Sequence, residues 1–332
     1  MGAGAAGPSL SRAEPWPSPW LVMIDKLELL LALAREKHFG HAAEKHGVTQ
    51  QTLSAAVKQL EARFGVMLVH RGSRFRGFTP EGDRVLEWAR RIVGDARAMQ
   101  QDLSAMRGHL EGHLRLGAIP TVLPMVARLT TPYREKYPGV RFSVHSATSD
   151  DLLQLLEQAD LDAGLTYLDN EKLGRVTTVA LYKERYCLLT AAEGPFGERD
   201  SVTWAEVGQV KLCLLTPDMQ NRRIIDKLIR DAGAEPAPSL ESNSMVVLLT
   251  HVRTAKWASV MPAVLADALG VTTQVRAIPI VAPDVAHTIG LVVPHTDPPM
   301  PMVQALIAEA RGLALEEGQG ALPPAPPLRT SP

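Results

Sequence analysis

The chain has 332 residues and a formal net charge of −1, and 45% of its residues are hydrophobic. This length can hold two or three domains, and with a mean hydropathy of −0.02 the composition is typical of a soluble globular protein rather than a fibrous or largely disordered one. No apolar run reaches the length of a membrane span and no signal peptide is recognisable, so we expect no membrane partner. The two cysteines, Cys187 and Cys213, cannot form a disulfide framework, which favours a cytoplasmic location.

Both ends of the chain are rich in proline and small residues. Residues 1–22 have no hydrophobic periodicity, and we expect them to be a disordered extension. Organised sequence begins directly after it, so Met1 and Met23 are both candidates for the native start. We likewise expect residues 317–332 to be a disordered tail.

Residues 23–79 contain three short helical patterns followed by two extended arms. The patterns cover residues 24–37, residues 40–46 and residues 49–64, and Gly47 suits a tight turn between the second and third. Two helices joined by a short glycine-containing turn predict a helix-turn-helix. In the third helix a buried stripe is predicted from the apolar spacing of Leu53, Val57, Leu60 and Phe64. The arms around Gly72 predict a hairpin wing.

Residues 80–110 predict a long linker helix. Thr79 suits the N-cap, Pro80 the first helical position and Glu81 the first turn. Its apolar residues recur at alternating spacings of four and three, and they are Val85, Ala89, Ile92, Ala96, Met99, Leu103 and Met106. This heptad seam favours a dimerising coiled coil, and the alternative is a helix packed on its own domain.

From Gly112 to about residue 316 strand-like and helix-like patterns alternate, which predicts an α/β domain with mostly parallel sheets. The expected strands are 113–119, 140–147, 161–167, 177–182, 186–191, 211–216, 257–263, 275–281 and 287–293. The expected helices are 121–136, 149–159, 218–232, 244–254 and 299–315. The length suggests two lobes, one of residues 112–182 with 284–316 and one of residues 183–283.

The polar face of the third helix indicates a nucleic-acid partner. Residues 24–76 carry nine Lys or Arg against five acids, which makes this segment basic within a nearly neutral chain. The outward residues of the helix are amides, hydroxyls and one cation, types that can meet base edges and phosphates: Thr49, Gln50, Gln51, Ser54 and Lys58. We expect Arg71, Arg74 and Arg76 of the wing to meet the DNA backbone or minor groove. The alternative is a polar face with no partner.

The segment "FGHAAEKHGVTQQTLSAAVKQLEARFGVMLVHRGSRFRGFTPEGDRVL" resembles the winged helix-turn-helix of LysR-type transcriptional regulators. The resemblance continues through the linker helix and "GHLRLGAIPTVLP", and covers about residues 23–315. It implies an all-α-type head, a dimerising helix and a two-lobed Rossmann-like effector domain. It also implies a homodimer or homotetramer on an interrupted palindrome of double-stranded DNA, a small co-inducer between the lobes, and RNA polymerase as a candidate partner. His46 and Gln51 depart from the family pattern, which leaves the base preference open.

Three segments that follow strands predict where the co-inducer binds. They offer hydroxyls and free N–H groups suited to a small carboxylate or another anion. Their candidate residues are Pro120, Thr121, Thr148, Ser149, Thr216, Met219, Gln220 and Asn221. The resemblance places the co-inducer at the first two segments and, across the cleft, at the third. The alternative for each hydroxyl residue is a plain helix N-cap.

Other chemistries have weaker support in the sequence. Cys187 and Cys213 could form a redox switch, but both lie in apolar strand-like runs and are expected to be buried structural thiols. We expect no metal site, no cofactor and no enzyme activity, because no ligand set, phosphate loop or nucleophile motif is recognisable. A transport-type binding protein and an α/β enzyme remain the alternatives to a regulator.

Overall fold

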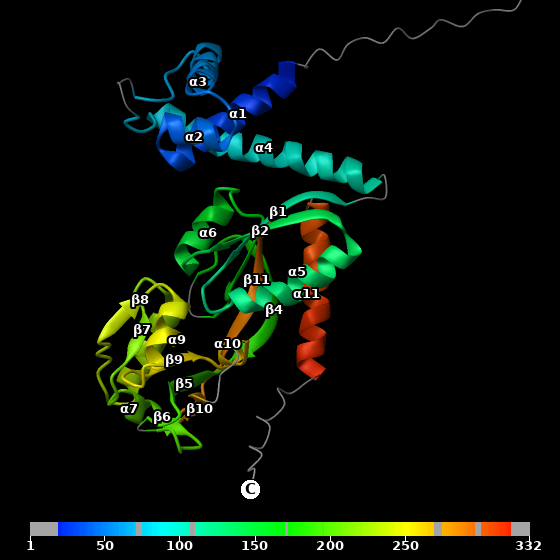
Figure 1. Cartoon of the computed structure of the whole chain (residues 1–332). Coiled ribbons are helices and arrows are strands. Elements are labelled where there is room, and N and C mark those ends of the chain that lie inside the picture. The colour runs from blue at the N-terminus through cyan, green and yellow to red at the C-terminus, as the bar shows by residue number, and fades with distance from the viewer. Residues whose placement is uncertain are drawn as a thin grey trace, which may run out of the picture. The chain divides into compact units, whose positions relative to one another are not determined.

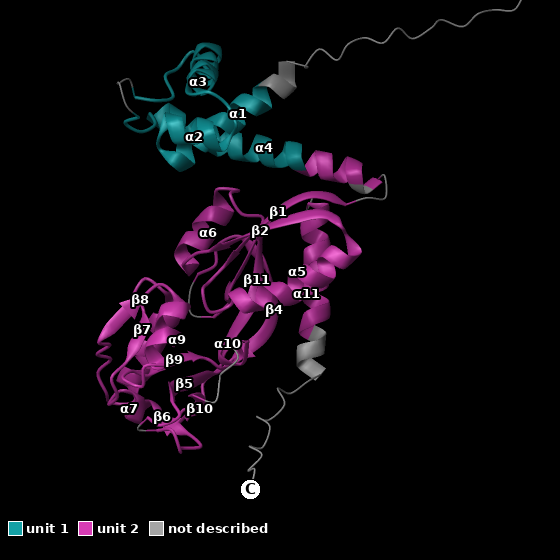
Figure 2. Ribbon diagram, viewed as in Figure 1, with its two compact units in different colours: residues 1–97 teal, residues 98–332 magenta. Residues whose placement is uncertain are grey.

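The computed structural model describes residues 19–70, 75–106, 110–169, 172–194, 196–268, 274–295 and 300–319. The chain divides into two compact units, residues 1–97 and residues 98–332 (Figure 2). None of the helices in these described ranges is both long and apolar enough to span a membrane.

Unit 1 is a small helical domain built on one apolar core (Figure 1). Its helices are α1 (Pro19–Glu36), α2 (Phe39–Lys45), α3 (Gln50–Phe64) and the first part of α4 (Pro80–Met106). Thr49 caps α3 by accepting a hydrogen bond from the Thr52 amide at 3.1 Å, and Gly65 ends the helix at a φ of 71°. The buried stripe of α3 is Leu53, Ala56, Val57 and Leu60. Phe64 was wrongly predicted to belong to it, since its side chain is 37% exposed.

The wing starts as an isolated antiparallel bridge between Val69 and Phe78. Glu61 of α3 holds its base, because its carboxylate accepts hydrogen bonds from the amides of Leu68 at 2.9 Å and Val69 at 3.3 Å. Gly82 must stay a glycine, because an added Cβ would lie 2.1 Å from the Leu68 carbonyl oxygen. The tip of the expected hairpin, residues 71–74, lies outside the described residues.

Two predicted boundaries were wrong. Helix α1 begins at Pro19, within the extension expected to be disordered, and α11 (Pro301–Gln319) continues into the predicted tail. The remaining parts of those two predictions, residues 1–18 and 320–332, lie outside the described residues.

The larger unit holds two lobes, each built on its own sheet (Figure 1). Lobe 1 has the strand order β2-β1-β3-β11-β4. These strands are β1 (Glu111–Ala118), β2 (Gly139–Ser146), β3 (Ala163–Tyr167), β4 (Val176–Glu184) and β11 (His287–Pro294). Its helices are the short η1 (Leu123–Met125), α5 (Val126–Lys136), α6 (Ser149–Glu157) and α11.

Lobe 2 has a sheet of order β6-β10-β5-β9 and a β7-β8 pair. Its strands are β5 (Tyr186–Ala191), β6 (Val202–Thr203), β7 (Cys213–Leu215), β8 (Leu240–Ser242), β9 (Ser259–Pro262) and β10 (Val275–Val281). Its helices are α7 (Trp204–Val207), α8 (Gln220–Asp231), α9 (Met245–Val252) and α10 (Ala263–Ala268). The short elements β6, α7, β8 and α10 were not predicted.

The chain crosses between the lobes twice. Strand β4 ends at Glu184 in lobe 1 and β5 begins at Tyr186 in lobe 2, while β10 ends at Val281 and the chain returns to lobe 1 at His287. The expectation of mostly parallel sheets was wrong, because β11 pairs antiparallel with β3 and β4, and β5 pairs antiparallel with β9 and β10. The strands next to the crossings lie side by side, so Glu184 is paired with His287 in the lobe 1 sheet.

Candidate DNA-binding and effector-binding sites

Helix α3 presents the polar face that the sequence predicts. Gln50, Gln51 and Lys58 are exposed, while Ser54 is half-buried. Thr49 is exposed as well, but its hydroxyl already serves the Thr52 amide and lies 2.9 Å from the Thr52 hydroxyl. Gln50 and Gln51 therefore present their side-chain amides to solvent, and Thr49 serves as the N-cap of the helix that carries them.

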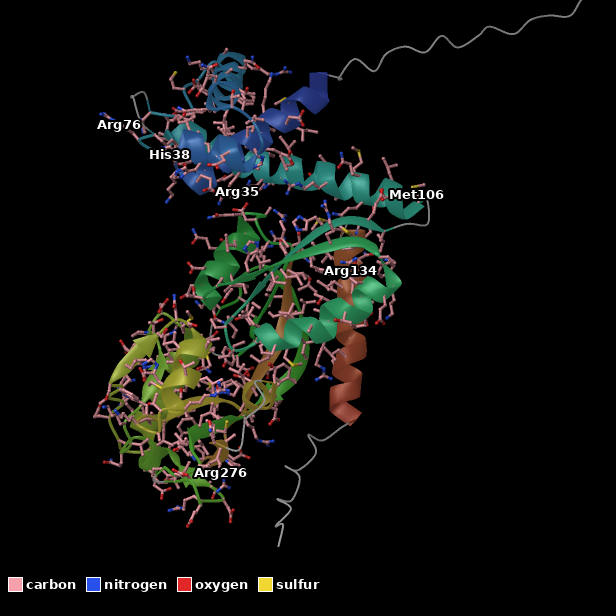
Figure 3. The ribbon with its side chains drawn as sticks, in the orientation of Figure 1. Arg35, His38, Arg76, Met106, Arg134 and Arg276 are labelled. Atoms are coloured by element: carbon pink, nitrogen blue, oxygen red, sulfur yellow. The ribbon has the colours of Figure 1, made fainter. Side chains whose placement is uncertain are left out.

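Of the three wing arginines only Arg76 is described, and its side chain is exposed (Figure 3). Arg71 and Arg74 lie outside the described residues. Arg76 lies two residues before Phe78, whose backbone pairs with Val69, so the base of the wing constrains its position.

Two histidines of the head have local roles that sequence patterns did not reveal. His38 caps α2, since its Nδ1 accepts from the His41 amide at 3.3 Å, and the two imidazole rings lie 4.4 Å apart. His46 is exposed at the end of α2, with its Nε2 3.2 Å from the guanidinium of Arg35. Partial burial and the Arg35 charge lower the pKa of His46, which favours the neutral imidazole. A neutral ring can lie beside the Arg35 guanidinium without repulsion.

The predicted seam of α4 divides into two parts. Ala89 is fully buried in the core of unit 1, so it was wrongly assigned to a dimer interface, and Val85 is half-buried and packs against the same core. Further along, the side chains of Ile92, Met99, Leu103 and Met106 are 40%, 57%, 52% and 85% exposed. Figure 3 labels Met106, the last residue of α4. Ala96 lies between them and is half-buried. Trp88, at 52% exposure, extends the same apolar face and was not predicted.

Buried hydroxyls follow strand β1. Pro120 and Thr121 are buried directly after it, and the hydroxyl of Thr121 has no hydrogen-bond partner although its side chain is only 3% exposed. It is not an N-cap, because the residue at that position of the following 3-10 helix is Val122. An unpartnered buried hydroxyl is costly to the folded protein alone, and it is the kind of group that a ligand can satisfy.

A second group of polar side chains joins the lobes. Ser149 at the start of α6 donates to the side-chain oxygen of Gln220 at the start of α8, at 2.8 Å. Gln220 in turn donates to the carbonyl oxygen of Asp169 at 3.2 Å, and Thr166 donates to Ser149 at 3.2 Å. Thr148, by contrast, is the N-cap of α6 and accepts from the Asp151 amide at 3.1 Å.

Asn221 makes a separate bridge between the lobes. Its side chain donates at 2.9 Å to the hydroxyl of Tyr167, which donates to Glu184 at the end of β4. Glu184 is fully buried, its other carboxylate oxygen has no partner, and burial raises its pKa to about 8, opposed by the Tyr167 hydrogen bond. Sequence analysis missed Tyr167 and Glu184, because both lie in strand-like runs where only contacts across the sheet reveal a polar role.

Two further candidates at the start of α8 differ in their surroundings. The hydroxyl of Thr216 is buried without a partner. Met219 belongs to the apolar core of lobe 2 together with Leu215 and Met245, so its surroundings are those of a packing residue. The nearby Arg222 is neutralised, with its guanidinium 2.7 Å from Asp226 and 2.6 Å from Glu241. Arg222 therefore offers no unpaired positive charge to a ligand at the lobe junction.

The two cysteines are buried in the core of lobe 2. Burial raises the pKa of the Cys187 thiol to about 12 and that of Cys213 to about 11. A thiol reacts with peroxides as the thiolate. Both cysteines are buried and their raised pKa values favour the protonated thiol, so neither side chain is suited to that reaction. Among the described residues, no three His, Cys, Asp or Glu side chains gather as a metal ion would require.

Comparison with protein families identifies both parts of the chain. Residues 24–83 match the bacterial regulatory helix-turn-helix of the lysR family, and residues 107–314 match the LysR substrate binding domain. The chain belongs to the LysR family of bacterial transcriptional regulators. This family resemblance was predicted from the sequence and is confirmed, and with it the α/β fold class with a helix-turn-helix head. The family comprises regulators rather than enzymes.

Relatives include an OxyR regulator and several proteins named hydrogen peroxide-inducible genes activators. The DNA-binding transcriptional dual regulator OxyR of Escherichia coli K12 is 28% identical over 270 residues, which cover 81% of this chain and 88% of that protein. A probable hydrogen peroxide-inducible genes activator of Mycobacterium xenopi is 36% identical over 163 residues, covering 49% of this chain and 86% of that protein.

Solved structures of LysR-type regulators share the fold. A full-length OxyR variant from Pseudomonas aeruginosa has a TM-score of 0.68 at 24% identity, with 87% of this chain and 94% of that chain covered. Full-length CbnR in complex with its target DNA has a TM-score of 0.62 at 20% identity, with 88% of this chain and 99% of that chain covered.

Proposed function

We propose that this LysR-type regulator reads double-stranded DNA with Gln50, Gln51, Ser54 and Lys58 of α3, and that Arg76, with Arg71 and Arg74, contacts the backbone or minor groove. This proposal is supported by the exposed side-chain amides of Gln50 and Gln51, which lie on a helix whose start is stabilised by the Thr49 N-cap. The side-chain amide of a glutamine can make two hydrogen bonds to one adenine. Lys58 can only donate, either to phosphates or to base edges rich in acceptors.

Titration of salt against duplex binding tests the DNA role. Full-length protein should bind a random duplex with an affinity that falls steeply as salt rises, because lysine and arginine displace counterions. Binding that is absent, or unaffected by salt, would contradict a DNA-binding head. A transport-type receptor would give that outcome.

We further propose that two chains associate along α4 through the exposed face from Ile92 to Met106. Four large apolar side chains on one helical face favour a partner helix over solvent. A dimer would present two recognition helices, as an interrupted palindrome requires. The regulator would then act in the cytoplasm, where its DNA lies.

A small polar co-inducer is proposed to bind at the lobe junction. The unpartnered hydroxyls of Thr121 and Thr216 support this, together with Ser149, Gln220 and Asn221, which join the lobes directly. A ligand that exchanges for these contacts would change the relative pose of the lobes and so the spacing of the DNA-binding heads. Sensing of peroxide by the cysteines is not part of the proposal, because both thiols are buried with raised pKa values.

The ligand class is tested by a matched screen on the full-length protein. Small carboxylates are compared with their amides, because hydroxyl and N–H groups suit an anion while the buried acid Glu184 stands close to the bridge. A ligand of this site raises the melting temperature of the native protein and loses that effect in Thr121→Val. Turnover of a compound, rather than binding alone, would favour an enzyme.

A further inference from the structure

The two amides that open α8 reach lobe 1 by different routes. Gln220 meets a serine hydroxyl and a backbone carbonyl, which are groups that do not titrate. Asn221 meets Tyr167, whose hydroxyl is committed to a carboxyl group. Only the second bridge therefore ends on a group that can gain or lose a proton.

Glu184 stands at the first crossing between the lobes. It is the last residue of β4, and only Arg185 separates it from β5 of lobe 2. Arg185 is exposed and forms an ion pair of 3.1 Å with Asp284 of the second crossing. This ion pair links the two crossings at the protein surface, whereas Glu184 is buried. A rotation of one lobe relative to the other must therefore use these two crossing segments as its hinge.

The surroundings of Glu184 contain few groups that could hold a charge. Tyr167 faces it from β3, Tyr186 at the start of β5 lies close enough to feel its charge, and His287 is its partner across the sheet. The Tyr186 hydroxyl lies 3.1 Å from Nδ1 of His287, and burial lowers the pKa of His287, which favours the neutral ring. Asp169 adds negative charge near Tyr186 and His287, and it accepts from the Thr288 amide. Lys183, next to Glu184 in the chain, points to solvent.

We infer that Glu184 is a positioning residue that, through Tyr167, fixes Asn221 across the lobe junction when it is protonated and favours opening of the junction when it is ionised. The protonated carboxyl can stay enclosed and accept from Tyr167, because a neutral hydroxyl without a partner costs less to bury than a charge. The ionised carboxylate gains a stronger hydrogen bond from Tyr167 but loses its water, and its second oxygen has no partner in the closed pose. Opening the junction returns water to that oxygen, at the expense of the Tyr167–Asn221 contact.

This inference rests on the proposed function only in assigning a regulatory meaning to lobe opening. The device would make the pose of the lobes, and therefore the response to a co-inducer, depend on pH near neutrality. A co-inducer that binds the closed pose would bind more weakly as the pH rises.

Calorimetry of the full-length protein tests the device without DNA or co-inducer, so its failure leaves the proposed function intact. Burial holds the folded pKa of Glu184 at about 8, above the 4.5 of a free glutamate. Its contribution to stability is therefore complete at low pH and is lost as the pH rises from about 4.5 to about 8, with no further change above that. Glu184→Gln keeps the shape and removes the titration, so the melting temperature of the effector unit in this variant should rise relative to the native protein across that window.

The matched control is Glu206→Gln. The Glu206 carboxylate belongs to the capping box of α7, and hydrogen bonds from the Thr203 backbone and side chain lower its pKa. Its stabilising effect is lost only as the pH falls, so Glu206→Gln should leave the pH profile near neutrality parallel to that of the native protein. A Glu184→Gln profile that also stays parallel would overturn the inference.

Asn221→Ala tests the bridge itself. In the native background it should lower the melting temperature by several degrees at about pH 6 and by much less at about pH 9, where the ionised Glu184 has already weakened the contact. In the Glu184→Gln background the loss should be equal at both pH values. An equal loss in the native background would show that Glu184 does not control the bridge.

Should Glu184→Gln fail to fold, Tyr167→Phe carries the test. It removes the hydrogen bond that lowers the pKa of Glu184, so the pH at which stability stops falling should move upward. An unchanged or lower value would contradict the inference.

Discussion

The side-chain amide of Asn221 donates a hydrogen bond of 2.9 Å to the hydroxyl of Tyr167, and this contact joins lobe 2 to lobe 1. Asn221 was predicted as an effector contact, whereas Tyr167 ends a strand whose residues are all buried. The place proposed for a co-inducer is thus already bridged by the chain's own side chains. A co-inducer must add to these contacts or exchange with them.

Thr121→Val should separate binding from folding. The Thr121 hydroxyl has no partner, so an isosteric methyl should change the free energy of unfolding by less than about 1 kcal/mol, or slightly stabilise the protein. The same change should abolish the thermal shift given by a co-inducer. Thr166→Val is the control, because its hydroxyl donates to Ser149 and its loss should destabilise the protein by about 1 kcal/mol. Destabilisation by Thr121→Val as large as by Thr166→Val would mean that the hydroxyl has a structural partner.

Gln51→Ala and Lys58→Ala should weaken DNA binding in different ways. Loss of the Gln51 amide should relax the preference among sequences by about 1–3 kcal/mol at one position, and loss of Lys58 should reduce affinity for all duplexes and lower the salt slope by about 1. Competition binding with operator and random duplexes over a salt series measures both. Gln154→Ala, an exposed glutamine on α6, serves as the control. Equal losses on every duplex after Gln51→Ala would count against base reading.

Leu103→Glu should convert dimers to monomers without unfolding the head. Leu103 is 52% exposed on α4, so a charge there is harmless in one chain and unfavourable between two. Sedimentation velocity reads the outcome, with the exposed Gln100→Glu as the charge-matched control. Dimers that persist in Leu103→Glu would place the interface elsewhere.

Leu86 is 4% exposed in the core of unit 1. Leu86→Ala should therefore lower the free energy of unfolding by about 2–5 kcal/mol.

Treatment with hydrogen peroxide should leave DNA binding unchanged. The thiols of Cys187 and Cys213 are buried with raised pKa values, so neither offers a reactive thiolate near neutral pH. Electrophoretic mobility shifts before and after oxidation, with Cys187→Ser and Cys213→Ser as controls, measure this. A shift that depends on either cysteine would instead bring the chain closer to the peroxide-responsive activity named in its relatives.

Much of the architecture could be predicted from local patterns. The apolar spacing of α3 located the helix, the Thr79-Pro80-Glu81 segment located the start of α4, and the run of strand patterns from 113–119 to 287–293 matches observed strands. Each of these signals is local, since a cap or a period is written in neighbouring residues. The residues of the family resemblance lie in the same segments.

Tertiary contacts decided what local patterns left open. Val85 and Ala89 share the heptad spacing of Leu103, yet they pack on their own domain, because spacing identifies an apolar face and not the surface that covers it. The sheets are mixed because strands near the two crossings return antiparallel, which no single segment encodes.

The sequence by itself determined the helix-turn-helix, its polar face and the alternation of strands and helices, because each depends on residues close together in the chain. Only the tertiary structure could reveal the bridge from Asn221 through Tyr167 to Glu184. Those three side chains come from α8, β3 and β4, and Glu184 is polar, enclosed and partly unpartnered only because the two lobes meet around it. Burial, which gives that carboxyl its raised pKa, is a property of the assembled lobes and not of the residues on either side of it.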